Sequence, residues 1–86
     1  MKNHKNTYAK TFEVMLEVLL FITYSGRAVT WRDVCEHVIE KDRQTLNRYL
    51  RALAEQGYLI KHEGAGNKIN SYTASEKANE LFGVKA

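Results

Sequence analysis

The residues best suited to chemistry in this sequence are the polar and basic side chains of residues 41–51. This segment, KDRQTLNRYLR, holds four cations and one anion, so its net charge is +3. The donors that we expect on its outer faces are Arg43, Gln44, Thr45, Asn47, Arg48 and Arg51. Arginine can form two hydrogen bonds with guanine in the major groove of DNA, and asparagine and glutamine can bind adenine in the same way. The segment predicts a DNA contact, with a solvated helix surface as the alternative.

A second group of donors flanks a glycine-rich stretch, residues 63–67. The candidates for DNA contact in this group are Lys61, His62, Asn67 and Lys68. A basic hairpin tip can lie along the DNA backbone or enter a minor groove, although short hairpins also carry lysine to protect a sheet edge. Four further residues are candidates for contact with phosphates: Thr30, Trp31, Arg32 and Lys41. Both groups favour a double-stranded DNA partner.

Metal binding and catalysis have little support in the residue spacing. Cys35 and His37 form a Cys-x-His pair, and His4 and His62 are the other imidazoles. A structural zinc site needs four ligands, and a helix would point residues 35 and 37 to different sides. No histidine is placed by the sequence to activate Cys35 as a nucleophile. We therefore expect no metal, no cofactor and no enzymatic activity.

Apolar residues at helical spacing predict a first helix from about Tyr8 to Tyr24, which ends at Ser25-Gly26. The face that we expect to point inward is formed by Phe12, Met15, Leu16, Leu19 and Ile22. A second stripe beside it is formed by Val14, Val18 and Phe21. This stripe could either pack in the core or form the seam of a homodimer.

Two shorter helices are expected to follow. Residues 30–33, Thr-Trp-Arg-Asp, match a capping box and predict a helix that runs to about Ile39. Asp42 can cap a third helix that ends at Gly57. Its inner face is expected to be Leu46, Tyr49, Leu50 and Leu53. The short turn between these two helices is typical of a helix-turn-helix.

The periodicity changes after Gly57. Residues 58–62 and 68–73 predict two strands of a β-hairpin, and residues 63–67 form a turn in which glycine can supply positive φ. Residues 73–76, Thr-Ala-Ser-Glu, match a second capping box and are expected to open a short helix that ends at Gly83. The element order is helix, short strand, helix, helix, hairpin, helix, which is an α+β fold that is mostly α.

The motif TLNRYLRALAEQGYLI, from Thr45 to Ile60, leads from the third helix into the hairpin. With this element order, it resembles the winged helix-turn-helix DNA-binding domains of small prokaryotic transcriptional regulators, MarR-like and related. The resemblance covers residues 8–82, and the tail SYTASEKA is also similar to the second wing strand and the following helix cap in such regulators. It implies a three-helix core, a two-stranded β-hairpin wing and a short C-terminal helix. It further implies a recognition helix at about 42–56 in the major groove and a wing at about 58–73 on the flanking backbone or minor groove.

Length and composition limit the organisation to one domain. The chain has 86 residues, of which 44% are hydrophobic, and a net charge of +3. We expect residues 1–7 to form a basic N-terminal arm and residues 8–83 to form the winged domain. The chain has one cysteine, Cys35, and therefore cannot form an internal disulfide. This is expected of a protein in a reducing cytoplasm. The longest apolar run is far shorter than the roughly 20 residues of a membrane helix, so we expect a cytoplasmic protein with no membrane partner.

We therefore predict sequence-specific binding of duplex DNA and a role as a transcriptional regulator. One small domain makes few contacts with DNA, so we also consider a homodimer formed through the first helix or the C-terminal helix. The alternative function is a protein-interaction adaptor whose basic helix binds an acidic partner without specific DNA binding. Fold alone does not choose between these two functions.

Overall fold

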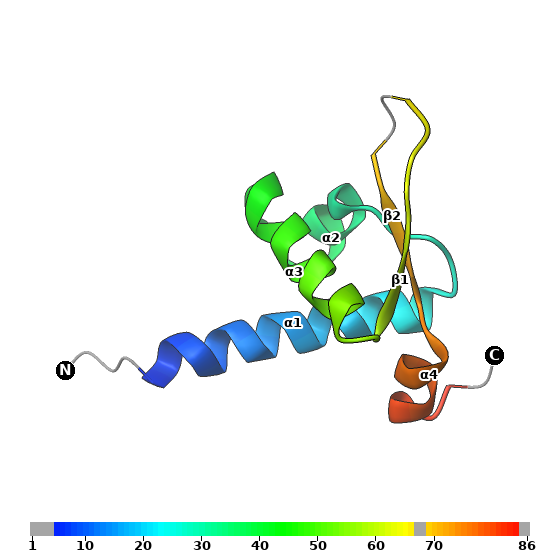
Figure 1. Cartoon of the computed structure of the whole chain (residues 1–86). Helices are drawn as coiled ribbons and strands as arrows, with labels where there is room; N and C mark the ends of the chain where they lie inside the picture. Colours follow the sequence, from blue (N-terminus) through cyan, green and yellow to red (C-terminus); the bar gives the residue numbers. More distant parts are fainter. Residues whose placement is uncertain (1–4, 67–68, 85–86) are drawn as a thin grey trace.

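The computed structural model of the chain describes residues 5–66 and 69–84, with side chains from Thr7 onward. The elements follow the predicted order (Figure 1). They are α1 (Lys5–Ser25), α2 (Trp31–His37), α3 (Arg43–Glu55), β1 (Leu59–His62), β2 (Ser71–Ala74) and α4 (Glu76–Phe82). The expected mostly helical α+β fold is confirmed. None of the helices in the described part of the chain has the length and apolarity needed to cross a lipid bilayer.

The hydrophobic core lies where α2, α3 and the hairpin pack on α1. Its largest fully buried side chains are Val18, Ile22, Val29, Val34, Leu46 and Leu50. Burying a side chain of this size stabilises a fold by about 1.5–3 kcal/mol relative to leaving it exposed. The predicted inner stripe of α3 is confirmed for its three leucines, which are buried, while Tyr49 packs half-buried against the core.

The inner face of α1 agrees with the prediction at Leu19 and Ile22, which are buried, but differs from it elsewhere. Val14 and Val18 are buried, whereas Phe12, which we expected in the core, is 66% exposed. Residues 14, 18 and 22 follow one another at intervals of four and form the stripe that packs on the other elements. The proposed dimer seam through Val14, Val18 and Phe21 was therefore wrong, because two of its three residues are in the core of the same chain. A helix that is apolar around most of its circumference does not reveal its inner face by periodicity.

Helix ends agree with the predicted caps in two of three cases. The capping box of α2 is formed by Thr30 and Asp33, and Asp42 caps α3 by accepting a hydrogen bond from the amide of Thr45 at 3.3 Å. The second capping box was wrong, because residues 73 and 74 belong to β2 and Ser75 is the N-cap of α4. The C-cap of α4 is Gly83 in the left-handed conformation, as predicted.

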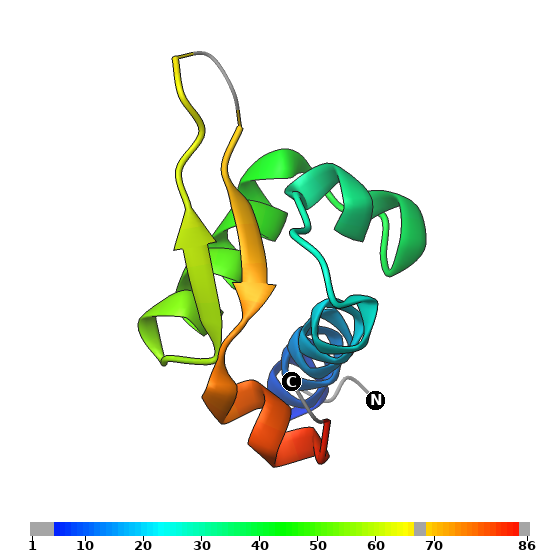
Figure 2. The same cartoon turned by 90° about the vertical axis from the view of Figure 1, so that its right-hand side faces the viewer.

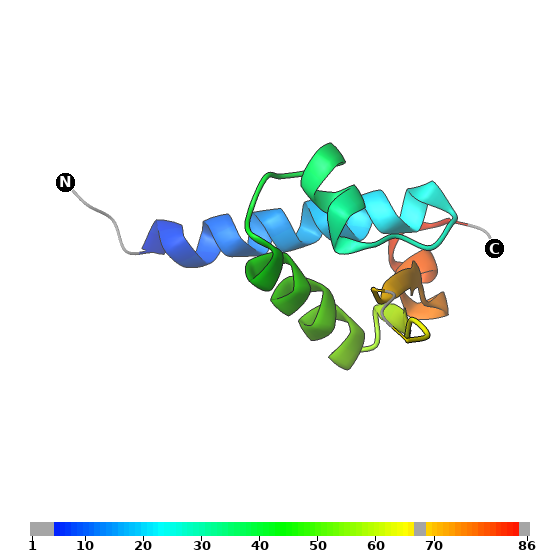
Figure 3. The ribbon, with the colours of Figure 1, turned by 90° about the horizontal axis from the view of Figure 1, so that it is seen from above.

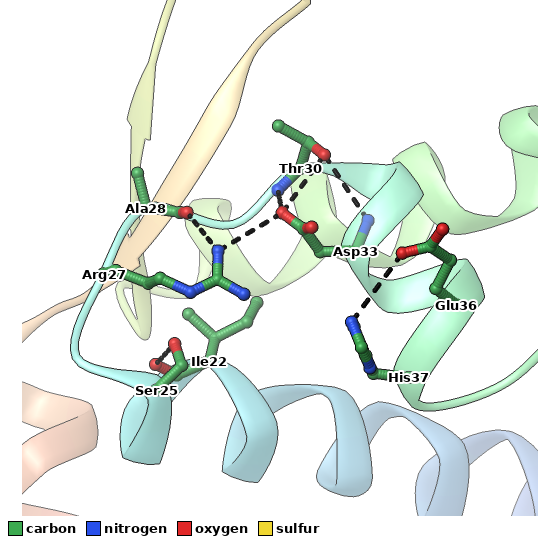
Figure 4. A network of polar contacts seen from close by, with 8 residues as sticks. All are labelled: Ile22, Ser25, Arg27, Ala28, Thr30, Asp33, Glu36 and His37. Atoms are coloured by element: carbon green, nitrogen blue, oxygen red, sulfur yellow. Dashed lines mark hydrogen bonds and ion pairs between the residues drawn. The ribbon is translucent and has the colours of Figure 1, made fainter.

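The Thr30–Asp33 cap is part of a small polar network that joins the connection after α1 to the start of α2 (Figure 4). The Asp33 Oδ2 atom accepts from the Thr30 amide at 3.0 Å and lies 3.6 Å from the Arg27 guanidinium. Arg27 also donates to the carbonyl of Ala28 at 3.2 Å. The hydrogen bond from the Thr30 backbone, with the nearby Arg27 charge, lowers the pKa of Asp33 despite its partial burial. The network fixes the start of α2.

The hairpin pairs over a shorter length than predicted. Strands β1 and β2 are antiparallel with Lys61 opposite Tyr72 and His62 opposite Ser71, and among the described residues the pairing ends there. Asn70 Oδ1 accepts from the Gly64 amide at 3.1 Å and holds the two arms together beyond the strands. Figure 2 shows the hairpin extending past the helices. Val29 joins the sheet through two 2.8 Å backbone hydrogen bonds with Tyr72, so the connection before α2 is anchored to the hairpin.

Candidate nucleic-acid interface

The outer surface of α3 carries two rows of polar side chains. Burial of Leu46, Leu50 and Leu53 fixes how the helix is rotated, and this rotation turns the polar positions outward. One row, spaced by four residues, is Arg43, Asn47 and Arg51, and the next is Gln44 and Arg48. All five line one shallow hollow on the helix surface. Among them only Asn47 is half-buried, and the other four side chains are exposed.

A deeper hollow of about 250 Å³ lies between α3 and the hairpin. Its lining residues are Trp31, Arg43, Asn47, Arg51, Lys61, Ile69, Asn70 and Tyr72. Within the described chain, the lining includes three cations and no acid. Lys61 reaches this hollow because it lies opposite Tyr72 in the sheet, on the strand face that turns toward α3. The hollow can therefore hold an anion between two elements.

Trp31 forms one wall of this hollow and packs against the core with its other parts. The guanidinium carbons of Arg32 and Arg43 each lie 5.7 Å from the centroid of its ring. Such cation–π contacts contribute about 0.5–1 kcal/mol at exposed sites. The buried Nε1 atom of Trp31 has no hydrogen-bond partner in the described part of the chain. Trp31 thus positions the first arginine of α3 as well as filling space at the edge of the core.

The two predicted site residues of β1, Lys61 and His62, lie on opposite faces of the strand. His62 forms a hydrogen bond through its Nε2 atom with Thr73 Oγ1 at 2.8 Å. It does not line the hollow. The predicted contacts of Asn67 and Lys68 lie outside the described residues.

The other predicted contact residues lie at the start of α2 and around the start of α3. The Thr45 hydroxyl donates to Asp42 Oδ1 at 2.6 Å, and the Thr30 hydroxyl accepts from the Asp33 amide at 3.4 Å. These two side chains are used in helix caps. Lys41 is half-buried in the turn before α3, and Arg32 is exposed on α2. Contact of these residues with DNA stays a prediction.

The structure adds three residues to the site that the sequence did not indicate, one of which is Ile69. Asn70 and Tyr72 line the hollow from the second arm of the hairpin. Burial raises the pKa of Tyr72, and the Arg51 charge partly opposes this effect, so the hydroxyl group remains neutral at physiological pH. Tyr72 lies opposite Lys61 in the sheet. The alternation of strand residues could have indicated it only if the register of β1 against β2 had been known.

Cys35, considered above with His37 as a metal ligand, lies half-buried on α2 with its Sγ atom 3.7 Å from the Lys41 carbonyl. Across residues 5–66 and 69–84, the structure contains no group of three or more potential metal-binding side chains.

A sequence comparison identifies the family to which this arrangement belongs. The model of the winged helix DNA-binding domain matches residues 13–78, from α1 to the first turn of α4. The chain belongs to the winged helix DNA-binding domain family. This winged helix domain matched none of the curated proteins and none of the solved structures with which it was compared. The description of the family as a DNA-binding domain suggests DNA as a partner, and the hairpin β1–β2 corresponds to the wing of the winged helix domain.

Proposed function

We propose that this winged helix domain binds duplex DNA in a sequence-specific manner and regulates transcription. The observation that carries the proposal is the hollow whose described lining brings Arg43 and Arg51 of α3 together with Lys61 of the wing. This arrangement suits a DNA backbone that passes between a helix in the major groove and a wing beside it. The resemblance to small prokaryotic regulators supports a role of this kind in a prokaryotic cytoplasm as part of the proposal. No catalytic step is part of the proposal.

In the proposed complex, the polar side chains of α3 have two different tasks. Gln44 and Arg48 do not line the hollow beside the wing and are exposed, so we assign them, with Asn47, to the edges of bases. Arg43, Arg51 and Lys61 hold a backbone phosphate in the hollow. The N-terminus of α3 adds the positive end of a helix dipole near Arg43, which also favours phosphate.

Selection of bound sites from a random duplex pool tests the proposal directly. We expect a short enriched motif, because base contacts from α3 should discriminate among sequences. A reporter gene placed downstream of the enriched site then tests regulation. An enriched pool without any motif would contradict specific recognition.

A mobility-shift assay at low salt separates DNA binding from the adaptor function. Arg48→Ala should weaken binding to the selected site, whereas Arg27→Gln should not, because Arg27 lines a separate hollow beside α4. No retardation of any duplex at micromolar protein would contradict DNA binding and favour an acidic protein partner.

A further inference from the structure

The N-terminal turns of α1 project beyond the rest of the domain (Figures 1 and 3). On these turns, the side chains of Tyr8 and Phe12 are 82% and 66% exposed. A few helical turns without tertiary support are marginally stable in water. Two exposed aromatic rings also leave a large apolar area in contact with water. Residues 5–12 also precede the region that matches the family, 13–78. The projecting turns therefore lie outside the matched region, and their exposed aromatic side chains suit a contact with another molecule.

An apolar groove of about 430 Å³ lies beside the place where these turns leave the domain. Its walls come from α1, the end of α3, the segment before β1, and α4, and include Met15, Leu16, Leu53, Tyr58, Leu81 and Phe82. Leu81 on its rim is 58% exposed. Phe12 lines the groove at its junction with the projecting turns. Because every lining side chain is aliphatic or aromatic, the groove fits another apolar surface.

We propose that a second copy of this chain covers the groove. The two chains pair about a twofold axis, and the projecting turns of α1 from each chain lie across the groove of the other. Each chain carries both halves of the contact, an aromatic projection and an apolar groove beside it. A twofold axis therefore satisfies both at once and closes the assembly at two chains.

The charges around this face are complementary between two copies. Residues 5–12, KNTYAKTF, contain two lysines and no acid. Helix α4 exposes Glu76 and Glu80, with Glu80 adjacent to the groove residue Leu81. Lys77 of the same helix is directed within its own chain, where it donates to the Gln56 carbonyl at 2.9 Å and lies 4.4 Å from the centre of the Tyr58 ring. Lys10 of one chain can thus face Glu80 of the other.

The exposed aromatic rings of the projecting turns supply a substantial part of the apolar surface that a dimer needs. Full burial of the exposed parts of Tyr8 and Phe12 alone would remove on the order of 300 Å² per chain from water. This is more than a third of the roughly 800 Å² per partner in a standard interface, before the groove itself is counted. Helix α3 lies above α1 in Figure 1, and α4 lies below it. Pairing through α1 and α4 would therefore leave both proposed DNA surfaces accessible.

Sedimentation equilibrium of the full chain without DNA tests this pairing, and its result does not depend on DNA binding. We expect wild-type protein to be a dimer at tens of micromolar, and Phe12→Asp to raise the dimer dissociation constant at least about tenfold. Because Phe12 is exposed, this variant should keep the circular dichroism spectrum of the fold. The matched control is Ile60→Asp, since Ile60 is an exposed apolar residue on the wing, outside the groove.

A charge exchange tests the reciprocal arrangement. Lys10→Glu and Glu80→Lys should each weaken the dimer, and the double variant should regain most of the loss. A wild-type chain that stays monomeric would overturn the proposal. A dimer that is unaffected by Phe12→Asp, or is weakened equally by Ile60→Asp, would overturn the assigned surface.

Discussion

The guanidinium carbon of Arg43 lies 5.7 Å from the ring centroid of Trp31, so the first residue of α3 is held by a side chain from the start of α2. An arginine that is free in solution loses side-chain entropy when it binds a phosphate. The contact with Trp31 restricts Arg43 before any ligand arrives, and the hollow that both residues line is therefore partly organised in the free protein.

Replacement of Trp31 should weaken DNA binding through this contact. Trp31→Leu keeps an apolar side chain at the core but removes the cation–π interaction, so we expect a loss of about 0.5–1 kcal/mol in binding free energy. Trp31→Phe keeps an aromatic ring and should lose less. Fluorescence anisotropy with a labelled duplex measures the affinities, and thermal unfolding shows that both variants are folded. Equal losses in the two variants would indicate that ring electrostatics are unimportant.

The polar face of α3 was predictable because two independent signals agree there. The spacing of Leu46, Leu50 and Leu53 defines the inner stripe, and Asp42 defines the start of the helix. Once both are known, the outward positions of Arg43 and Arg48 follow from helix geometry.

The parts of the fold that differ from prediction depend on contacts between distant residues. Phe12 and Val14 are both apolar, and only packing against the other helices decides that Val14 is buried. In the hairpin, we expected strands over 58–62 and 68–73, whereas β1 and β2 pair with Leu59 opposite Ala74 and His62 opposite Ser71, a register that periodicity along one strand does not give. The pairing of Leu59 with Ala74 extends β2 to Ala74, and the cap of α4 is therefore Ser75.

Asn47 and Arg48 should contribute to the choice of DNA sequence. If they contact base edges, Asn47→Ala or Arg48→Ala should each reduce discrimination between the selected site and a site changed at one base pair by about 1–3 kcal/mol. Competition binding with a series of single-base variants locates the affected position. A uniform loss across all variants would show that the residue contacts only the backbone.

Lys61 and His62 are neighbours in sequence, but the structure predicts different effects of replacing them. Lys61 lines the hollow, so Lys61→Ala should weaken binding to all duplexes alike and reduce the slope of log K against log salt by about 0.9. His62→Ala should change the slope little, because its ring is on the opposite strand face and is bonded to Thr73. Affinities measured at several salt concentrations between about 50 and 300 mM give this slope and distinguish the two variants. A larger effect from His62→Ala would place the DNA on the outer face of the wing.

The cap of α2 should make stability depend on pH in acid. The pKa of Asp33 is lowered in the folded chain, chiefly by the hydrogen bond from the Thr30 amide. Its contribution to the free energy of unfolding is therefore complete above the unfolded pKa of about 4, and is lost as the pH falls through the lower folded value. Urea unfolding at several pH values should show a shallower acid decline for Asp33→Asn than for wild type. Thr30→Ala, which removes the hydroxyl cap, should cost about 1 kcal/mol even at neutral pH. An unchanged acid decline in Asp33→Asn would assign the pH dependence to other carboxylates, such as the exposed Asp42, whose pKa is also lowered by the bond from Thr45.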